Sequence, residues 1–226
     1  MMLSMKTPVD KHGLAVDVAT RIRAAILSGE LQIGSRINEI ELASSLQVSR
    51  GPIRDAIVIL KQEGLLDGKW HKGAFVRTLS KKDAEEIYSL RSVIERLAVE
   101  RVVKLGTAQD LRDIESKVRG IEAAASNGSQ AEMLEADIAF HESLYCAAHH
   151  DRLLHAWFGM RSQIALLLLN RQGVDSNYRR ELSQEHWAIF NAISDRDGAR
   201  STELISRHIN EAGARVLSRL TAHMAG

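Results

Sequence analysis

The sequence is poor in several residue types, and each shortage argues against a class of protein. Its 226 residues include one cysteine, Cys146, so no intrachain disulfide can form, which agrees with a reducing cytoplasm. Two prolines and 4% aromatic residues disfavour a disordered chain or a β-sandwich. The longest apolar run is Ile164–Leu169, far short of the roughly 20 residues of a membrane span, and the start lacks the apolar block of a signal peptide. We expect a cytoplasmic, mainly helical protein with no membrane partner.

The charge is nearly balanced, with a small difference between the two ends of the chain. The formal net charge is +1, but residues 1–80 carry 11 Lys and Arg against 8 Asp and Glu, while the remainder carries 19 against 21. A basic face is sufficient for nucleic-acid binding, so this balance allows a DNA-binding N-terminal part. The length fits one large domain or two modest ones, and we expect two.

The first 80 residues have the pattern of three short helices followed by a β-hairpin. Apolar residues recur at helical spacing three times, the last between Ser49, a suitable N-cap, and Gly64. The Asp67-Gly68 turn signal and the short apolar segment after it predict the hairpin. This is the layout of a winged helix-turn-helix, whose later helix enters the major groove. We therefore predict a domain over residues 1–79 that binds double-stranded operator DNA.

Basic and hydrogen-bonding residues gather at the start of the third helix and on the hairpin. Arg50 and Arg54 lie one turn apart and point from one face, and arginine can bind guanine O6 and N7 with two hydrogen bonds. The hairpin would contact phosphates or the minor groove. The predicted DNA-contacting residues are Ser49, Arg50, Arg54, Lys69, His71, Lys72 and Gly73. The same spacing also fits two solvated arginines, with Arg54 paired to an acid such as Asp55.

This part of the chain resembles the GntR family of bacterial transcription regulators. The segment "LQIGSRINEIELASSLQVSRGPIRDAIVILKQEGLL" followed by "HKGAFV" is similar to the family's headpiece over about residues 15–78. The resemblance implies that Arg50 and Arg54 contact DNA and that Gly73 lies at the tip of the wing. Ile40 departs from the pattern, because some relatives carry a DNA-contacting arginine there. The base preference of that branch is therefore not expected here.

The chain beyond residue 80 has helical periodicity interrupted by short polar breaks. Ser80 and Asp83 form a capping-box pattern at the start of a long helix, and later breaks fall at Gly106, "SNGS", "HHDR", "QGVDSN" and "DRDG". Short connections make successive helices neighbours, so we predict an antiparallel all-α bundle over residues 80–226. The expected fold is mainly α, with a winged helix-turn-helix followed by this bundle.

Four ionisable residues interrupt the apolar faces of the bundle helices. Asp137 and His141 lie one turn apart on one helix, and His186 and His208 each lie on a later helix. Because burial of unpaired polar groups is costly, these residues could converge on a metal, as in other helical bundles. Each histidine alone also fits a core residue that bonds a neighbour. Three further histidines at a helix junction are expected to be exposed: His149, His150 and His155.

The helical part resembles the FCD ligand-binding domain that follows GntR headpieces in the FadR subfamily. The resemblance spans about residues 83–222 and rests on "YSLRSVIERLAVE", "DIAFHESL", "EHWAIFNAI" and "RHI" in that order. It implies a divalent transition metal, with zinc as the leading assignment and nickel, iron or manganese as alternatives. The implied metal ligands are Asp137, His141, His186 and His208.

The same resemblance implies an effector. An arginine at the place of Arg91 binds the carboxylate of a small organic acid in FCD domains, and Arg161 is a second candidate. The helical pattern alone fits equally an ion pair between Arg91 and Glu95, or an arginine that extends to the surface.

These observations predict a metabolite-responsive DNA-binding regulator, expected to be a repressor without enzymatic activity, acting as a homodimer on a palindromic site. One alternative is a metal-dependent hydrolase or oxygenase in which Glu142 or Glu185 acts as general base. Another is a regulator whose metal is purely structural. Arg91 distinguishes the last alternative, because a structural metal site needs no carboxylate-binding arginine.

Overall fold

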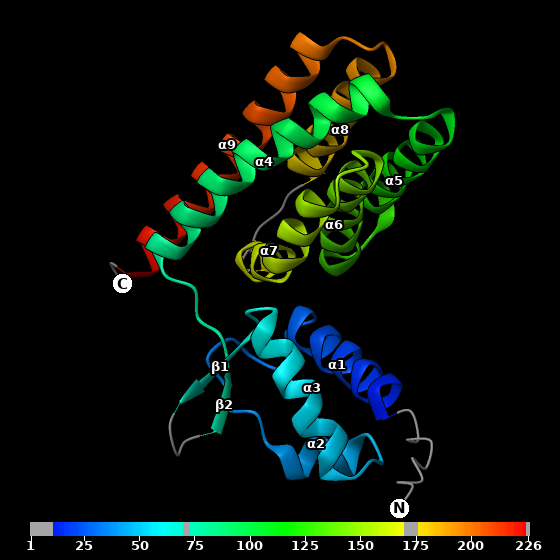
Figure 1. Ribbon diagram of the computed structural model, residues 1–226. Helices are drawn as coiled ribbons and strands as arrows, with labels where there is room; N and C mark the ends of the chain where they lie inside the picture. The colour runs from blue at the N-terminus through cyan, green and yellow to red at the C-terminus, as the bar shows by residue number, and fades with distance from the viewer. Residues whose placement is uncertain (1–10, 70–72, 170–175, 225–226) are drawn as a thin grey trace, which may run out of the picture. The chain divides into compact units, whose positions relative to one another are not determined.

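The computed structural model describes residues 11–69, 73–169 and 176–224, and the chain divides into two compact units, Met1–Thr78 and Leu79–Gly226 (Figure 1). Helices account for most of the described residues, and one two-stranded sheet lies among them. The predicted fold class, a mainly α chain with a winged helix-turn-helix followed by a helical bundle, is confirmed. None of the helices in the described ranges combines the length and the apolarity needed to cross a membrane.

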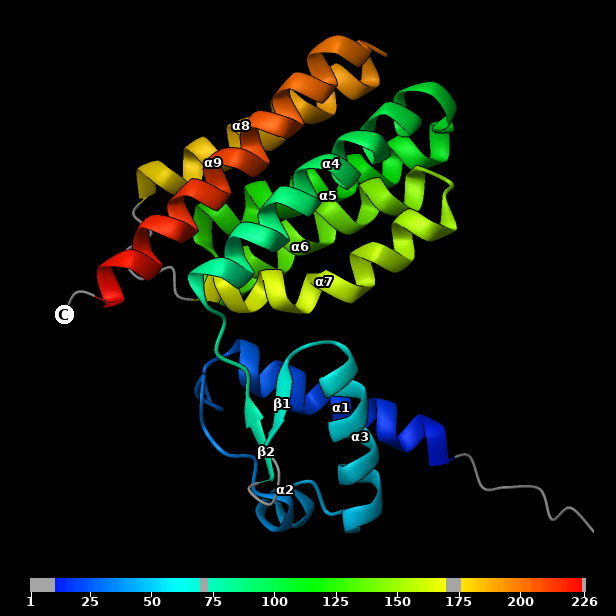
Figure 2. The same ribbon diagram turned by 60° about the vertical axis from the view of Figure 1, so that its left-hand side comes forward.

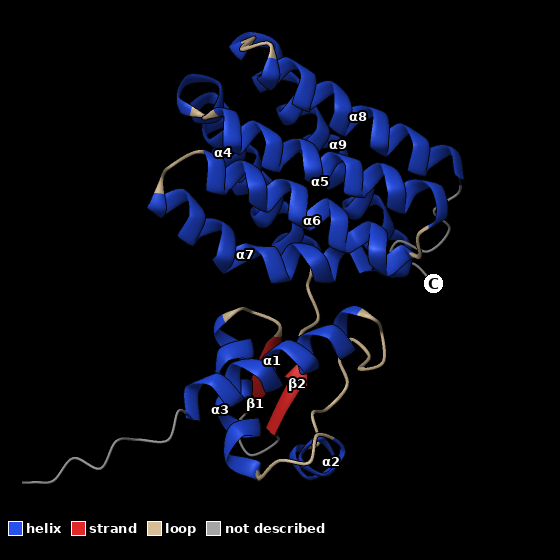
Figure 3. Cartoon of the chain, turned by 90° about the vertical axis from the view of Figure 1, so that its right-hand side faces the viewer, coloured by secondary structure: helices blue, strands red, loops and turns tan. Residues whose placement is uncertain are grey.

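The N-terminal unit consists of three helices and a small antiparallel sheet (Figure 3). Its elements are α1 (Lys11–Leu27), α2 (Glu39–Ser45), α3 (Arg50–Gln62), β1 (Leu66–Lys69) and β2 (Gly73–Val76). Helix α1 packs against α3, and buried side chains of both form the core, among them Val18, Ile22, Ile26, Ile53, Ile57 and Leu60. Pro52 lies in the first turn of α3, where backbone N–H groups have no acceptor within the helix, so it does not break the helix.

The hairpin is fixed at its base by burial and at its tip by glycine. Leu66 pairs with Val76 at the base, and both side chains are buried. Gly73 pairs with Lys69 near the tip and has a φ of 90°, a left-handed conformation that favours glycine. The wing therefore begins in the core of the unit and extends outward.

The C-terminal unit is a helical bundle. It contains α4 (Lys81–Leu105), α5 (Ala108–Asn127), α6 (Gln130–Ala147), α7 (Asp151–Leu169), α8 (Ser176–Ser194) and α9 (Gly198–Met224). Helices α4, α5 and α6 each begin with a complete capping box, with Ser80, Thr107 and Ser129 as the capping residues. Each cap hydroxyl accepts from a backbone N–H three residues on, and the acidic side chain there accepts from the cap. These reciprocal bonds explain why the helix starts are predictable from the sequence.

The long helices α4 and α9 lie side by side in opposite directions (Figures 1 and 2). Helix α5 packs against both α6 and α8, and α4 also contacts α6 and α7. Gly213 of α9 packs tightly against Tyr88 of α4, because a Cβ atom at Gly213 would lie 3.0–3.1 Å from Tyr88 side-chain atoms. The bundle therefore surrounds an interior to which α4, α6, α8 and α9 all contribute buried side chains.

Three arginines bind backbone carbonyls at the C-terminal ends of helices distant in sequence. Arg196 donates to the carbonyl oxygens of Val102, Val103 and Gly106 at the end of α4, over 2.6–2.9 Å. Arg101 donates to the carbonyl oxygens of Ala148 and His149 at the end of α6. Arg179 donates to the carbonyl oxygen of Gly128 at the end of α5. The last carbonyls of a helix lack partners within the helix and carry partial negative charge, so a guanidinium there stabilises the helix end.

Candidate metal centre and nucleic-acid interface

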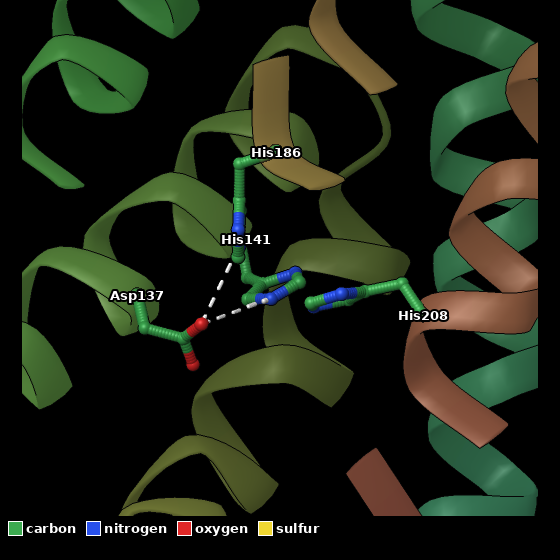
Figure 4. Close-up of side chains that lie close together, drawn as sticks. All are labelled: Asp137, His141, His186 and His208. Carbon is green, nitrogen blue, oxygen red and sulfur yellow. Dashed lines mark ion pairs between the residues drawn. The ribbon is translucent and has the colours of Figure 1, made fainter. Parts of the chain in front are cut away.

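Asp137, His141, His186 and His208 point toward one another in the interior of the bundle (Figure 4). Asp137 and His141 come from α6, His186 from α8 and His208 from α9, and one ligand atom from each lies within 4.8 Å of the others. Asp137 Oδ1 is 3.4 Å from His186 Nε2 and 3.9 Å from His141 Nε2. All four side chains are buried. The structure thus brings together the four residues predicted to bind a metal.

The Nδ1 atom of each histidine in the cluster forms a hydrogen bond with a protein oxygen atom. His141 Nδ1 bonds to Glu95 Oε1, His186 Nδ1 is 2.7 Å from the Leu182 carbonyl oxygen, and His208 Nδ1 is 2.8 Å from Glu185 Oε2. An acceptor at Nδ1 favours the tautomer that carries its proton there. Each ring then keeps the lone pair of Nε2 for a metal, as is usual for metal-binding histidines.

Burial favours the neutral imidazole form of two histidines of this cluster, His208 and His141. It lowers the pKa of His208 to about 4, against the opposing effect of the hydrogen bond that His208 donates to Glu185, and it lowers the pKa of His141 despite the charge of Glu95. Burial alone would raise the pKa of Glu95, but His141 and Arg91 outweigh it and hold that pKa at about 2. Metal ions bind neutral imidazole, so these ligands need no deprotonation near neutral pH.

The donor set and its surroundings fit a divalent transition metal. Within the described ranges, His141 Nε2 and His186 Nε2 are buried without a hydrogen-bond partner. An unsatisfied buried group costs about 1–3 kcal/mol, which coordination would offset. The Phe140 ring lies edge-on to both imidazoles, at centroid distances of 5.2 and 4.7 Å, and limits their rotation. Three imidazoles and a carboxylate suit zinc and related metals.

Arg91 of α4 lies in the same interior and is 1% exposed. Its Nε donates to Glu95 Oε2 at 2.9 Å, and its guanidinium carbon is 5.8 and 5.9 Å from the ring centroids of Tyr88 and Trp157. The ion pair with Glu95 is therefore present but buried, and the alternative of an arginine extending to the surface is wrong. Arg91 Nη2 is buried and lacks a hydrogen-bond partner in the described part of the chain, so it can donate to a ligand.

Arg161 of α7 has a different environment. Its side chain is 33% exposed, its Nη1 donates to Glu142 Oε2 at 2.6 Å, and its guanidinium lies over the Phe158 ring at 4.7 Å. Glu142 also accepts from Trp157 Nε1 at 3.2 Å. The structure thus pairs Arg161 with a carboxylate of the protein rather than with the four-residue cluster.

The three histidines at the helix junction lie away from this cluster. His149 and His155 are exposed and His150 is half-buried. His149 Nε2 bonds to Asp110 Oδ2 at 2.9 Å, near the start of α5.

Sequence reasoning missed the two carboxylates that orient the histidines. The pattern indicates Glu95 only as a partner of Arg91, yet Glu95 lies on the buried face of α4, three residues before Ala98. A glutamate on an apolar face was a usable signal for a buried partner. Glu185 gives no such signal, because its bond to His208 depends on how α8 packs against α9.

The start of α3 presents two exposed arginines to solvent. The side chains of Arg50 and Arg54 are 51% and 61% exposed, and both donate to Glu39 Oε2 at 3.0 Å. Arg54 is thus paired with Glu39 of α2 and not with Asp55 as one alternative expected. The hydrogen bonds from Arg54 and Arg50 lower the pKa of Glu39. One carboxylate oxygen therefore fixes both guanidinium groups on one surface.

The other predicted DNA contacts are only partly described. Ser49 is the N-cap residue of α3, but its side chain makes no capping hydrogen bond, so its hydroxyl is not committed to the helix. Gly73 begins β2 on the wing. The side chain of Lys69, and the residues His71 and Lys72, lie outside the described residues, so their contacts stay predictions.

A winged helix-turn-helix unit joined to a helical bundle with a buried cluster of potential ligands defines a class of two-part DNA-binding regulators. The chain belongs to the GntR family within this class. Residues 14–76 match the family described as "Bacterial regulatory proteins, gntR family", and residues 86–211 match the FCD domain. The resemblance found in the sequence is therefore confirmed.

Known relatives agree with this assignment over most of their length. The chain is 31% identical to the HTH-type transcriptional regulator YdhC of Bacillus subtilis, over 84% of this chain and 85% of the relative. It is 28% identical to the gluconate operon transcriptional repressor of Bacillus licheniformis, over 89% of this chain and 84% of that relative. A GntR transcriptional regulator from Rhodococcus sp. RHA1 has the same fold, with a TM-score of 0.81 at 22% identity, over 91% of this chain and 98% of that one.

Proposed function

We propose that this protein is a transcriptional repressor that binds operator DNA and responds to a small carboxylate-bearing metabolite bound in its FCD domain beside a divalent metal ion. The observation that carries the proposal is Arg91, a buried cation with a free donor, joined through Glu95 to one of the predicted metal ligands. A purely structural metal needs no such arginine. The named function of the gluconate operon repressor supports repression as the mode of action.

The metal would be held by Asp137, His141, His186 and His208, whose ligand atoms already converge. When bound, it would supply a Lewis acid that attracts an oxygen atom of the effector. Glu95, Glu185 and the Leu182 carbonyl hold the three imidazoles in orientation. Zinc is our leading assignment, with nickel, iron or manganese as alternatives.

The effector would be a small organic acid whose carboxylate binds Arg91. Arginine recognises carboxylates through paired N–H donors, and Arg91 Nη2 is available for this among the described groups. Tyr88 and Trp157 beside the guanidinium supply flat apolar surfaces. Arg161 is left out of the proposed site, because Glu142 already occupies its Nη1.

DNA would be read by the start of α3 and contacted by the wing. Arg50 and Arg54 would reach base edges, with Ser49 on phosphate and Lys69, His71, Lys72 and Gly73 of the wing beside the backbone or minor groove. The exposed, jointly held position of both arginines supports this assignment.

The protein would act as a homodimer through one face of α4. Leu90, Val93 and Leu97 follow each other at helical spacing and are 51%, 61% and 41% exposed. A contiguous apolar surface of this kind marks an interaction site, and a palindromic operator requires two headpieces. A second copy of the chain is therefore the partner that we propose for this face.

An enzymatic alternative has less support from the structure. The two candidate general bases both have partners, since Glu142 binds Trp157 and Arg161, and Glu185 binds His208. The family and the relatives are regulators of transcription, which as a class are not enzymes. The regulator therefore remains the function that the site supports best.

The proposal is tested by measuring operator binding by fluorescence anisotropy across a panel of organic acids, with wild-type protein, Arg91→Ala and Arg161→Ala. A true effector should change wild-type DNA affinity by about 5- to 150-fold, the usual range of coupling between sites. Arg91→Ala should lose this response and retain effector-free DNA binding, while the control Arg161→Ala should keep both. A wild-type response in Arg91→Ala would refute the arginine's role, and the absence of metal after dialysis against zinc would refute the metal centre.

A further inference from the structure

Glu95 connects the metal cluster to Arg91, because its two carboxylate oxygens bind different partners. Oε1 bonds to Nδ1 of His141, and Oε2 accepts from Nε of Arg91 at 2.9 Å. The side chains of all three residues are at most 1% exposed. One rigid carboxylate group therefore sets the position of a metal ligand and of the effector-binding arginine at the same time.

Glu95 is fully buried, and further protein side chains surround its carboxylate. The Tyr145 hydroxyl donates to Oε2 at 3.5 Å, and the Tyr145 ring stacks on Trp157 with a centroid distance of 4.9 Å. Trp157 in turn lies beside the Arg91 guanidinium. In such a dry network each hydrogen bond depends on the others, so a movement of Arg91 toward a ligand alters the bond that Glu95 makes to His141.

We propose that Glu95 is a positioning residue that links Arg91 to the metal centre, so that any change at Arg91 alters the affinity for metal. Linkage is reciprocal, so metal binding alters affinity at Arg91 by the same factor. This link rests on the proposed function, but it does not require the effector to touch the metal. Metal and effector would stabilise each other's sites through the protein.

The chain supplies a matched control in Glu185. This carboxylate holds the Nδ1 of another ligand, His208, in the same way that Glu95 holds His141. Its side chain is 33% exposed, and it forms a hydrogen bond with His208 on α9 rather than with Arg91 on α4. Both glutamates should therefore matter for metal affinity, whereas only Glu95 should transmit a change at Arg91.

The experiment measures the affinity of the full-length protein for Zn²⁺ by competition with a chromogenic chelator. It compares wild type, Arg91→Met, Glu95→Gln and their double variant, and repeats the arginine substitution with Glu185→Gln. Each glutamine substitution should weaken zinc binding by about 10- to 100-fold, as for other groups behind metal ligands. Arg91→Met should change zinc affinity by about fivefold or more in wild type and in Glu185→Gln, but by less than about twofold in Glu95→Gln.

An equal effect of Arg91→Met in all three backgrounds would show that the arginine acts on the metal directly and would overturn the link. If Arg91→Met does not fold, Arg91→Lys is used instead, because it keeps the charge but replaces the Nε–H donor to Glu95 with an ammonium group of different reach and geometry. Failure of wild-type protein to bind zinc would instead refute the metal centre itself. The two failures are therefore distinguishable.

Discussion

Single carboxylates position more than one basic group at both sites of this protein. Glu39 holds Arg50 and Arg54 through one oxygen, and Glu95 holds Arg91 and His141 through two. A carboxylate with two partners reduces the freedom of both and offsets part of their charge. At the residue scale, acids outside the proposed DNA-contacting and metal-binding residues therefore position the basic groups of both proposed sites.

Glu39→Gln should raise affinity for non-specific DNA by roughly threefold to tenfold and lower the ratio of specific to non-specific binding. The substitution removes one negative charge near the phosphates and weakens the common acceptor of both arginines. Anisotropy titrations against operator and random duplexes measure both quantities. Glu41→Gln is the control, since Glu41 lies on the same helix and bonds to Asn38. Identical behaviour of the two variants would show that only net charge matters.

Metal-free protein should lose stability as the pH falls from about 6.5 toward 4. The pKa of His208 is about 4 in the folded chain and about 6.5 when unfolded, so the unfolded state binds more protons between these values. The contribution of neutral His208 to the free energy of unfolding is present in full above about pH 6.5. By pH 4, His208 alone lowers that free energy by an amount on the order of 3 kcal/mol. Urea unfolding of chelator-treated protein at several pH values measures it. His208→Gln should flatten the profile, and an unchanged slope would contradict the assignment.

At the scale of elements, the closeness of α4 and α9 depends on one glycine. Gly213→Ala would place a methyl group 3.0–3.1 Å from Cβ, Cγ and Cδ1 of Tyr88; Cβ cannot move aside by a rotamer change, and the side chain is buried. We expect a net loss of about 1–3 kcal/mol despite the better helix propensity of alanine. Gly120→Ala, in α5 with nothing within 4 Å, should gain about 0.5–1 kcal/mol. Thermal unfolding compares the two, and stabilisation by both would refute the steric argument.

Helix positions could be predicted because their signals are local. Ser80 with Asp83, the "SNGS" break before α6 and Gly64 after α3 all lie within a few residues of the ends that they determine. The convergence of Asp137, His141, His186 and His208 was also foreseen, since apolar faces must turn inward. The partners of these residues were not, because Glu185 meets His208, and Glu39 meets Arg54, only through packing between separate helices.

At the scale of the whole molecule, the exposed face of α4 should determine the oligomeric state. Leu90→Glu combined with Val93→Glu would put charges into an apolar contact, so we expect dimerisation and operator binding to weaken by at least about tenfold. Sedimentation equilibrium and anisotropy measure the two effects. Leu105→Glu is the control, because Leu105 is 52% exposed on the same helix but lies about two turns beyond Leu97, at the helix end. A fully dimeric double variant would place the interface elsewhere.

The arginines at the helix ends give the bundle an unequal response to acid. Arg196, Arg101 and Arg179 hold backbone carbonyls at three helix ends, and arginine as a residue type keeps its charge in proteins. His208 of the interior, by contrast, takes up a proton as the pH falls toward about 4. Acidification therefore loosens the centre of the bundle before its ends, which reverses the usual fraying of helices from their termini. The last turns of α4, α5 and α6 would then be slow sites of amide hydrogen exchange, and the proposed metal ion would be released while the outer frame persists.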